Sequence, residues 1–228
     1  LVIPNGEPNY FLGRAHLGVE EYLAQFDFAT ATFKTYGVIG DRARRSDFFV
    51  GEKSPQYGAL PGSLVRLVKF FLPNVRLQLT VRDPVSRGWS HIKHAGLIGD
   101  AQDFFEGRIE EPGPKLGMVL HAGEYDAHIR RWAQAFDLDQ LLINDFSDIK
   151  ERPQQFLDEI STHFGVEPFE LSAERLENRR SRGATAPIPM PDSVRDGLER
   201  YYADTIFDAA SLRALVIKTR TSMNQAAD

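Results

Sequence analysis

Apolar and polar residues alternate from Val75 to Val81, and this period of two is typical of a β-strand. An Asp83-Pro84 pair then stops the strand, because Asp can cap the free N–H groups of a following helix and Pro fits its first position. Apolar residues then return at helical spacing, at Val85, Trp89 and Ile92. The pattern predicts a strand, a sharp turn and a helix whose apolar face points inward.

The same periodicities predict the other elements. Compact apolar runs at Phe48–Gly51 and Gln140–Asn144 indicate buried strands, and the first would form a right-handed β-α-β unit with the Val75 strand. The alternation in the Val75 strand is at odds with burial on both faces, which favours a continuous apolar run. Residues 96–122 contain Gly, Pro and acidic residues and are predicted to be a loose loop. Helices are predicted at Val19–Phe28, between Pro61 and Pro73, from Gly123 through Phe136, from Phe156 to Gly165, and at Asp192–Tyr202 with a cap at Asp192 or Ser193, followed by a helical tail that frays over Asn224–Asp228.

Composition indicates a globular protein of one α/β domain. The chain has 228 residues, 42% of them hydrophobic and 26% charged, and its net charge of −5 does not favour non-specific binding of nucleic acid. It has no cysteine, which excludes disulfides and thiolate metal sites, and its six histidines show no metal-ligand spacing. No apolar run has the length of a membrane span and no signal peptide is visible. We therefore expect a cytoplasmic protein without a metal or a transmembrane segment.

Arg82 and Ser90 are the first candidates for chemistry. Arg82 follows the predicted strand, and ligands dock at the carboxyl ends of strands in open α/β sheets. Ser90 lies in the second turn of the following helix, whose N-terminus offers N–H donors to an anion. A planar cation and a hydroxyl at this place suit a phosphate, although a capped turn with a solvated arginine would show the same pattern.

The pattern R-D-P-x-x-R-x-x-S from Arg82 to Ser90 resembles the 3′-phosphate-binding segment of sulfotransferases that use 3′-phosphoadenosine 5′-phosphosulfate (PAPS). Glu52–Tyr57 resembles the Glu-Lys-[Ser/Thr]-Pro-x-Tyr segment of that family. Glu7–Phe11 resembles its Lys-Glu-x-x-Phe-Phe stretch, with Gly6 in place of the Lys. With similar segments further on, the resemblance covers most of Glu7 to Phe164. It implies a P-loop-NTPase-like parallel sheet flanked by helices in three α/β/α layers, with residues 1–228 as a single sulfotransferase domain.

The resemblance also implies a role for each matching residue. Arg82 and Ser90 would bind the 3′-phosphate, and Lys53 would contact an acceptor hydroxyl or a sulfuryl oxygen. Glu7 would be the general base, with His91 and His94 as rivals. A basic, glycine-containing loop would close over the adenosine and the 3′-phosphate, and its candidates are Arg179, Arg180, Arg182 and Gly183.

One segment of the family pattern is missing from the sequence. Family members begin with a strand and a loop of the kind G-x-x-[KR]-x-G-T-[ST], which grips the 5′-phosphosulfate, and no such segment is present here. We expect one strand and one helix, with this loop between them, to precede Leu1, because the remaining motifs stand in family order. The alternative is that the loop has been lost and the chain is not a sulfotransferase.

The expected function is therefore sulfuryl transfer from PAPS to a hydroxyl or amine of an acceptor. A carbohydrate or glycolipid is favoured because Glu7 stands where carbohydrate- and heparan-sulfate-type members use a carboxylate base. Two alternatives remain open: a P-loop-type nucleotide or sugar kinase, and a non-catalytic module that binds a nucleotide or an anionic glycan. The sequence fixes neither the acceptor nor the oligomeric state.

Overall fold

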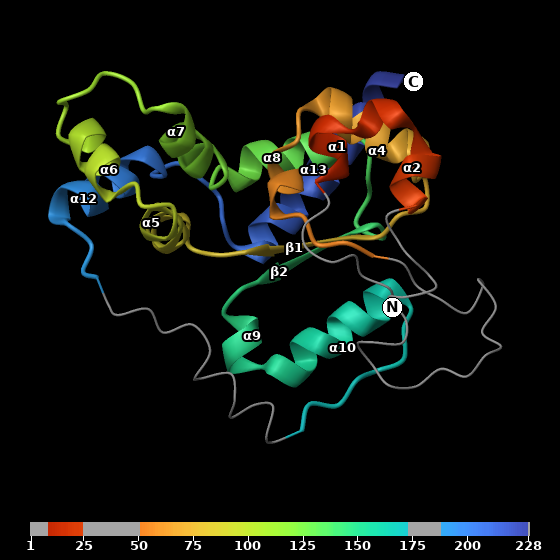
Figure 1. Ribbon diagram of the computed structural model, residues 1–228. Helices are drawn as coiled ribbons and strands as arrows, with labels where there is room; N and C mark the ends of the chain where they lie inside the picture. The colour runs from red at the N-terminus through yellow and green to blue at the C-terminus, as the bar shows by residue number, and fades with distance from the viewer. Residues whose placement is uncertain (1–8, 25–50, 173–187, 228) are drawn as a thin grey trace. The chain divides into compact units, whose positions relative to one another are not determined.

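The computed structural model describes residues 9–24, 51–172 and 188–227 (Figure 1). The chain divides into two units, Leu1–Pro73 and Asn74–Asp228, and each is described by itself. The single domain predicted for residues 1–228 therefore stays a prediction. The strand predicted at Phe48–Gly51 lies outside the described residues except for Gly51, and so does its β-α-β unit.

The described part of the first unit contains short helices and 3₁₀ turns, and aromatic rings from several of them pack together. The rings of Tyr10, Phe11, Tyr22 and Tyr57 pack with centroids 5.2–5.7 Å apart. The helix predicted between Pro61 and Pro73 is present, and the one predicted from Val19 is described as far as Ala24. The elements of this unit are α1 (Tyr10–Gly13), the 3₁₀ turn η1 (Ala15–Leu17), α2 (Val19–Ala24), the 3₁₀ turn η3 (Pro55–Ala59) and α4 (Gly62–Phe71).

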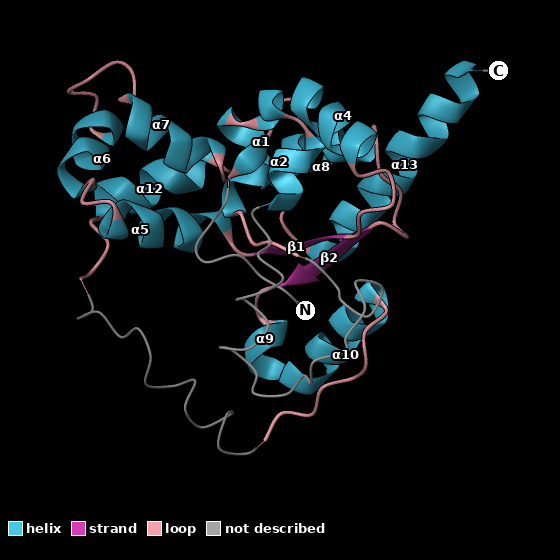
Figure 2. Cartoon of the chain, turned by 45° about the vertical axis from the view of Figure 1, so that its right-hand side comes forward, coloured by secondary structure: helices cyan, strands magenta, loops and turns pink. Residues whose placement is uncertain are grey.

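The second unit is built around two parallel strands. β1 (Leu77–Val81) pairs with β2 (Leu141–Asp145), from Leu77 opposite Leu141 to Val81 opposite Asp145. α10 lies on one side of this pair and α8 and α13 lie on the other (Figures 1 and 2). The helices are α5 (Pro84–His94), α6 (Ile98–Phe105), α7 (Pro114–His121), α8 (Tyr125–Ala133), α9 (Asp148–Glu151), α10 (Pro153–Phe164), α12 (Asp192–Tyr201) and α13 (Ala209–Ala227).

One face of the strand pair is polar, which explains the alternation in the sequence of β1. Gln78 donates to the hydroxyl of Thr80 at 2.6 Å and to the amide oxygen of Asn144 at 3.4 Å. The Asn144 amide, which is fully buried, donates in turn to Glu159 of α10 at 2.7 Å. The polar residues of β1 thus take part in a hydrogen-bonded layer between the strands and α10. This layer removes the objection that an alternating strand does not suit a sheet covered on both faces.

The loop predicted for residues 96–122 is wrong, because α6 and α7 occupy much of this stretch. Both helices bury small apolar faces in a core shared with α5 and α12. Ala101 is fully buried on α6, and Leu116 and Leu120 are buried on α7. Gly107, Glu110, Glu111 and Gly113 lie between the two helices, whereas Gly99 and Asp100 lie within α6.

Two predicted helix ends also need correction. α12 begins at Asp192 with Pro191 in the capping position, and no side chain of Asp192 or Ser193 caps it. A Pro at this position starts a helix through its fixed φ angle rather than through a side-chain hydrogen bond. α13 extends to Ala227, so the predicted fraying over Asn224–Asp228 is not observed for residues 224–227.

Candidate functional site

The turn between β1 and α5 places Arg82 and Ser90 as the sequence predicts. The Asp83 carboxylate accepts a hydrogen bond from the backbone N–H of Ser86 at 2.8 Å, and Pro84 is the first residue of α5. Trp89 and Ile92 are buried in the helical core, which fixes the rotation of α5. Arg82 is half-buried just beyond the last residue of β1, and Ser90 is exposed one helical turn after Ser86.

The guanidinium of Arg82 lies against an aromatic ring. Its guanidinium carbon lies 5.1 Å from the centre of the Phe146 ring. Among the described residues, no carboxylate forms an ion pair with it. A ring face stabilises a cation without neutralising it, so the N–H groups of Arg82 stay available to an anionic ligand.

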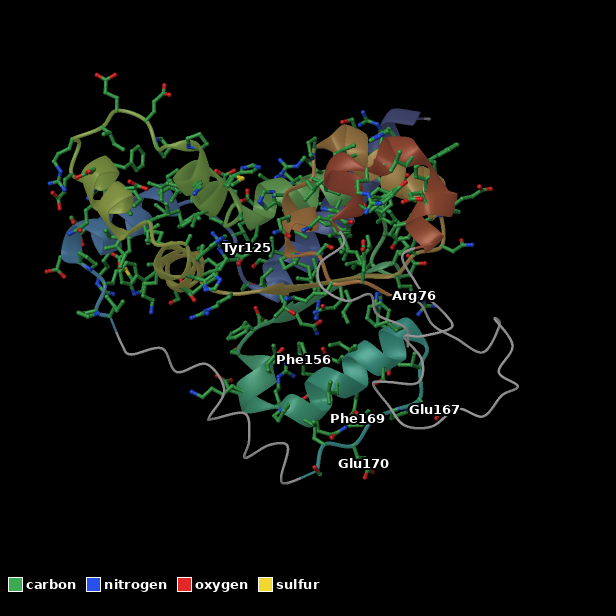
Figure 3. All side chains as sticks on the ribbon, in the orientation of Figure 1. Arg76, Tyr125, Phe156, Glu167, Phe169 and Glu170 are labelled. Atoms are coloured by element: carbon green, nitrogen blue, oxygen red, sulfur yellow. The ribbon has the colours of Figure 1, made fainter. Side chains whose placement is uncertain are left out.

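Tyr125, the first residue of α8, is buried next to the same turn (Figure 3). Burial raises the pKa of its phenol, whereas Arg87, Arg82 and a hydrogen bond with the Arg82 backbone act in the opposite direction. Tyr125 therefore stays neutral and fixes the backbone of Arg82 from the side of α8. Sequence reasoning assigned Tyr125 and Phe146 no role at this turn, although Phe146 follows β2 directly, as Arg82 follows β1.

The two rival bases occupy the last turn of α5. The pKa of His91 is lowered, first by partial burial and then by Arg87 and His94. A lowered pKa keeps the imidazole neutral near pH 7, and only the neutral ring can accept a proton. His91 and His94 are both exposed, so they remain candidates.

Lys53 belongs to the first unit, in a segment tied to the residues that follow Glu7. The backbone N–H of Asn9 donates to the Ser54 hydroxyl at 3.3 Å, and that of Phe11 donates to the Tyr57 hydroxyl at 3.2 Å. Lys53 itself is exposed. Two segments that the family resemblance singled out therefore lie side by side within this unit.

Glu52, next to Lys53, is a half-buried carboxyl. Burial raises its pKa, while a hydrogen bond with Tyr57 acts in the opposite direction. Its Oε2 atom is buried without a hydrogen-bond partner in the part of the chain that the structure describes. No pattern in the sequence distinguishes Glu52 from an exposed surface glutamate.

The remaining predicted residues lie outside the described ranges, and their roles stay predictions: Glu7, Arg179, Arg180, Arg182 and Gly183. Within the described ranges, no group of three or more His, Asp or Glu side chains is arranged to hold a metal ion. No described helix combines the length and the apolar composition needed to cross a membrane.

Comparison with solved structures decides the fold. The structure is similar to the crystal structure of a sulfotransferase from Alicyclobacillus acidocaldarius, with a TM-score of 0.61 and 20% sequence identity over 94% of this chain and 84% of that one. The chain has a sulfotransferase fold. The α/β class and the resemblance to sulfotransferases predicted from the sequence are thereby confirmed.

Curated relatives of this sulfotransferase-fold chain carry names of the same kind. It is 26% identical over 228 residues to the bifunctional heparan sulfate N-deacetylase/N-sulfotransferase 4 of Mus musculus, covering 87% of this chain and 24% of the relative. It is 27% identical over 190 residues to the human bifunctional heparan sulfate N-deacetylase/N-sulfotransferase 3, covering 71% and 20%. The chain thus spans a quarter or less of the length of these two relatives. No protein-family model matches the sequence.

Proposed function

We propose that this protein transfers the sulfuryl group of PAPS to an amine or hydroxyl of a carbohydrate. The observation that carries the proposal is Arg82, a half-buried cation without an acidic partner among the described residues, at the carboxyl end of a parallel strand in a sulfotransferase fold. This is the edge at which ligands of open α/β sheets dock. The relatives named for heparan sulfate N-sulfotransfer support a carbohydrate acceptor. A cytoplasmic location stays a prediction from the sequence.

In the proposed reaction, some residues of this chain would bind the nucleotide and the acceptor, and another would accept the proton. The acceptor nitrogen or oxygen forms a bond to sulfur, the bond from sulfur to the 5′-phosphate oxygen breaks, and adenosine 3′,5′-bisphosphate leaves. Arg82 and Ser90 would hold the 3′-phosphate, and Lys53 would contact a sulfuryl oxygen or the acceptor. Glu7 would take the acceptor proton. As in phosphoryl transfer, positioning and charge stabilisation would supply most of the rate enhancement.

Calorimetry on the wild type and two variants tests the donor site. Arg82→Ala should weaken binding of adenosine 3′,5′-bisphosphate by about 1.5–3 kcal/mol, the scale of a charge-assisted hydrogen bond, and Ser90→Ala should cost less. Binding of adenosine 5′-monophosphate, which lacks the 3′-phosphate, should barely change. Arg76→Ala is the control: it removes an equal charge next to Leu77, at the start of β1, whereas Arg82 follows its end (Figure 3). It should leave the binding of both nucleotides unchanged. Equal losses for both nucleotides in Arg82→Ala would mean that the substitution damages the fold.

Turnover distinguishes the enzyme from the alternatives. The protein, expressed with any residues encoded before Leu1, is incubated with radiolabelled PAPS and with N-desulfated heparan sulfate, a glycolipid or a phenol. Transfer to the glycan is expected. A preference for ATP with phosphoryl transfer would identify a kinase, and bisphosphate binding without turnover of any acceptor would identify a binding module.

A further inference from the structure

We propose that Phe146 is a positioning residue that presents the guanidinium of Arg82 to the phosphate. The inference deepens the proposed function and rests on it. It starts from the pairing of the two strands, in which Val81 is opposite Asp145. The backbone N–H of Phe146 donates to the carbonyl of Val81 at 2.7 Å and closes this last pair, as parallel pairing requires.

Arg82 and Phe146 are the residues that directly follow the last paired residues, Val81 and Asp145, on the two strands. Side chains on neighbouring strands alternate between the two faces in step, so these two project to the same side of the sheet. They belong to the side on which Gln78 and Asn144 are hydrogen-bonded. The guanidinium carbon of Arg82 accordingly lies 5.1 Å from the centre of the Phe146 ring.

The exposure of Phe146 indicates that its ring is not there to fill the core. The side chain is 46% exposed at the carboxyl end of the strand pair. Phe136, in contrast, is completely buried. A large exposed ring has little hydrophobic benefit at this place, whereas its face offers a cation a favourable quadrupole.

Among the described residues, the other contacts at Arg82 hold its backbone, so the ring of Phe146 is what restrains its side chain. Tyr125 and the Asp83 cap hold the peptide at the start of α5. An arginine side chain without a partner loses considerable rotamer entropy when it binds a ligand. A ring beneath the guanidinium reduces that loss and leaves the in-plane N–H groups free to donate to phosphate oxygens.

Substitutions at Phe146 test the inference through the affinity for adenosine 3′,5′-bisphosphate, measured by calorimetry at fixed ionic strength. Phe146→Leu should weaken binding by roughly 2- to 6-fold, the range of an exposed cation–π contact, whereas Phe146→Trp should retain it. Phe169→Leu is the matched control, since Phe169 is also 46% exposed but lies in the segment after α10 (Figure 3). This control should bind like the wild type.

A double-mutant cycle then shows whether Phe146 acts through Arg82. In an Arg82→Gln background, Phe146→Leu should have no further effect on bisphosphate affinity. An undiminished effect in that background, an equal loss for adenosine 5′-monophosphate, or wild-type affinity in Phe146→Leu would overturn the inference while leaving the proposed function intact. Failure of the wild type to bind the bisphosphate at all would overturn the proposed function, and the inference with it.

Discussion

The arginines of this protein differ in the group that contacts the guanidinium. Arg152 is bound by both oxygens of Asp148, each at 2.8 Å, and Arg14 pairs with Glu21 at 2.8 Å. In both arginines, N–H groups are already occupied by carboxylate oxygens. Arg82 is stacked on a ring instead. An arginine that is ordered but not neutralised is the kind that can bind an anion.

Whereas Arg82 is a charged side chain, His128 is a titratable side chain that is buried in its neutral form. Its Nε2 atom is 2.8 Å from the carbonyl of His121 and therefore carries the proton, while Nδ1 accepts from Arg131. Burial is the main cause that lowers its pKa from 6.5 to about 4, and Arg131 contributes. The unfolded chain consequently binds more protons than the folded protein between these two pH values.

This pKa difference predicts a loss of stability in mild acid. The contribution of neutral His128 is complete above about pH 6.5 and declines as the pH falls towards 4. At about 1.4 kcal/mol per pH unit, the free energy of unfolding should fall by about 2 kcal/mol between pH 7.5 and pH 5 through His128 alone. Urea denaturation across this range measures the slope. His128→Gln keeps a donor and an acceptor but does not titrate, so its free energy of unfolding should fall by about 2 kcal/mol less than that of the wild type over this range. Equal pH slopes in the two proteins would contradict the assignment.

At the scale of elements, a helix or strand could be predicted from the sequence where the residues that determine it lie close together in the chain. The strand, turn and helix around Arg82 were predictable because alternation, the Asp83 cap and Pro84 all act within a few residues. α6 was not, because its small apolar face is stabilised by α12, far along the chain. The contact between Phe146 and Arg82 was hidden for the same reason, since it depends on the register of β1 against β2. A single sequence does not reveal such long-range pairing.

The packing of α12 against its neighbours allows a matched test with two glycines. A methyl group on Gly197, in the middle of α12, would overlap the ring of Phe105 and lie 2.7 Å from its Cβ, so rotation of the ring cannot relieve the clash. A methyl group on Gly88, in the middle of α5, would meet Leu198 at 3.4 Å, which is ordinary contact. Gly197→Ala should therefore lower the free energy of unfolding by about 1–3 kcal/mol. Gly88→Ala should raise it by up to about 1 kcal/mol through helix propensity.

Chemical denaturation of both variants at one pH measures these changes. The same substitution in the interior of two helices should have opposite signs, which separates packing from propensity. A Gly197→Ala variant as stable as the wild type would show that α12 and α6 can move apart without cost.

At the scale of the whole molecule, the negative net charge means that binding of an anionic nucleotide depends on individual cationic side chains. The protein carries a net charge of −5, so its long-range field does not attract an anionic donor. Binding must then rely on cations whose charge is not cancelled nearby, and Arg82 meets that condition among the described residues. The predicted roles divide between the two units, with the nucleotide-binding residues Arg82 and Ser90 in the second and Lys53 and Glu7 in the first.

This division predicts two separable kinetic phenotypes. Glu7→Gln keeps the shape of the side chain and removes its basicity, so kcat should fall by about 10²-fold or more while bisphosphate affinity stays near that of the wild type. Arg82→Ala should show the reverse pattern, with weaker nucleotide binding as its main effect.

Glu20→Gln, an exposed acidic position on α2 of the same unit as Glu7, is the matched control and should leave kcat unchanged. His91→Asn and His94→Asn are measured in parallel with PAPS and the glycan acceptor. Normal turnover by Glu7→Gln together with a large loss in either histidine variant would move the base to α5, and the expectation of a carboxylate-based, carbohydrate-type site would fail with it.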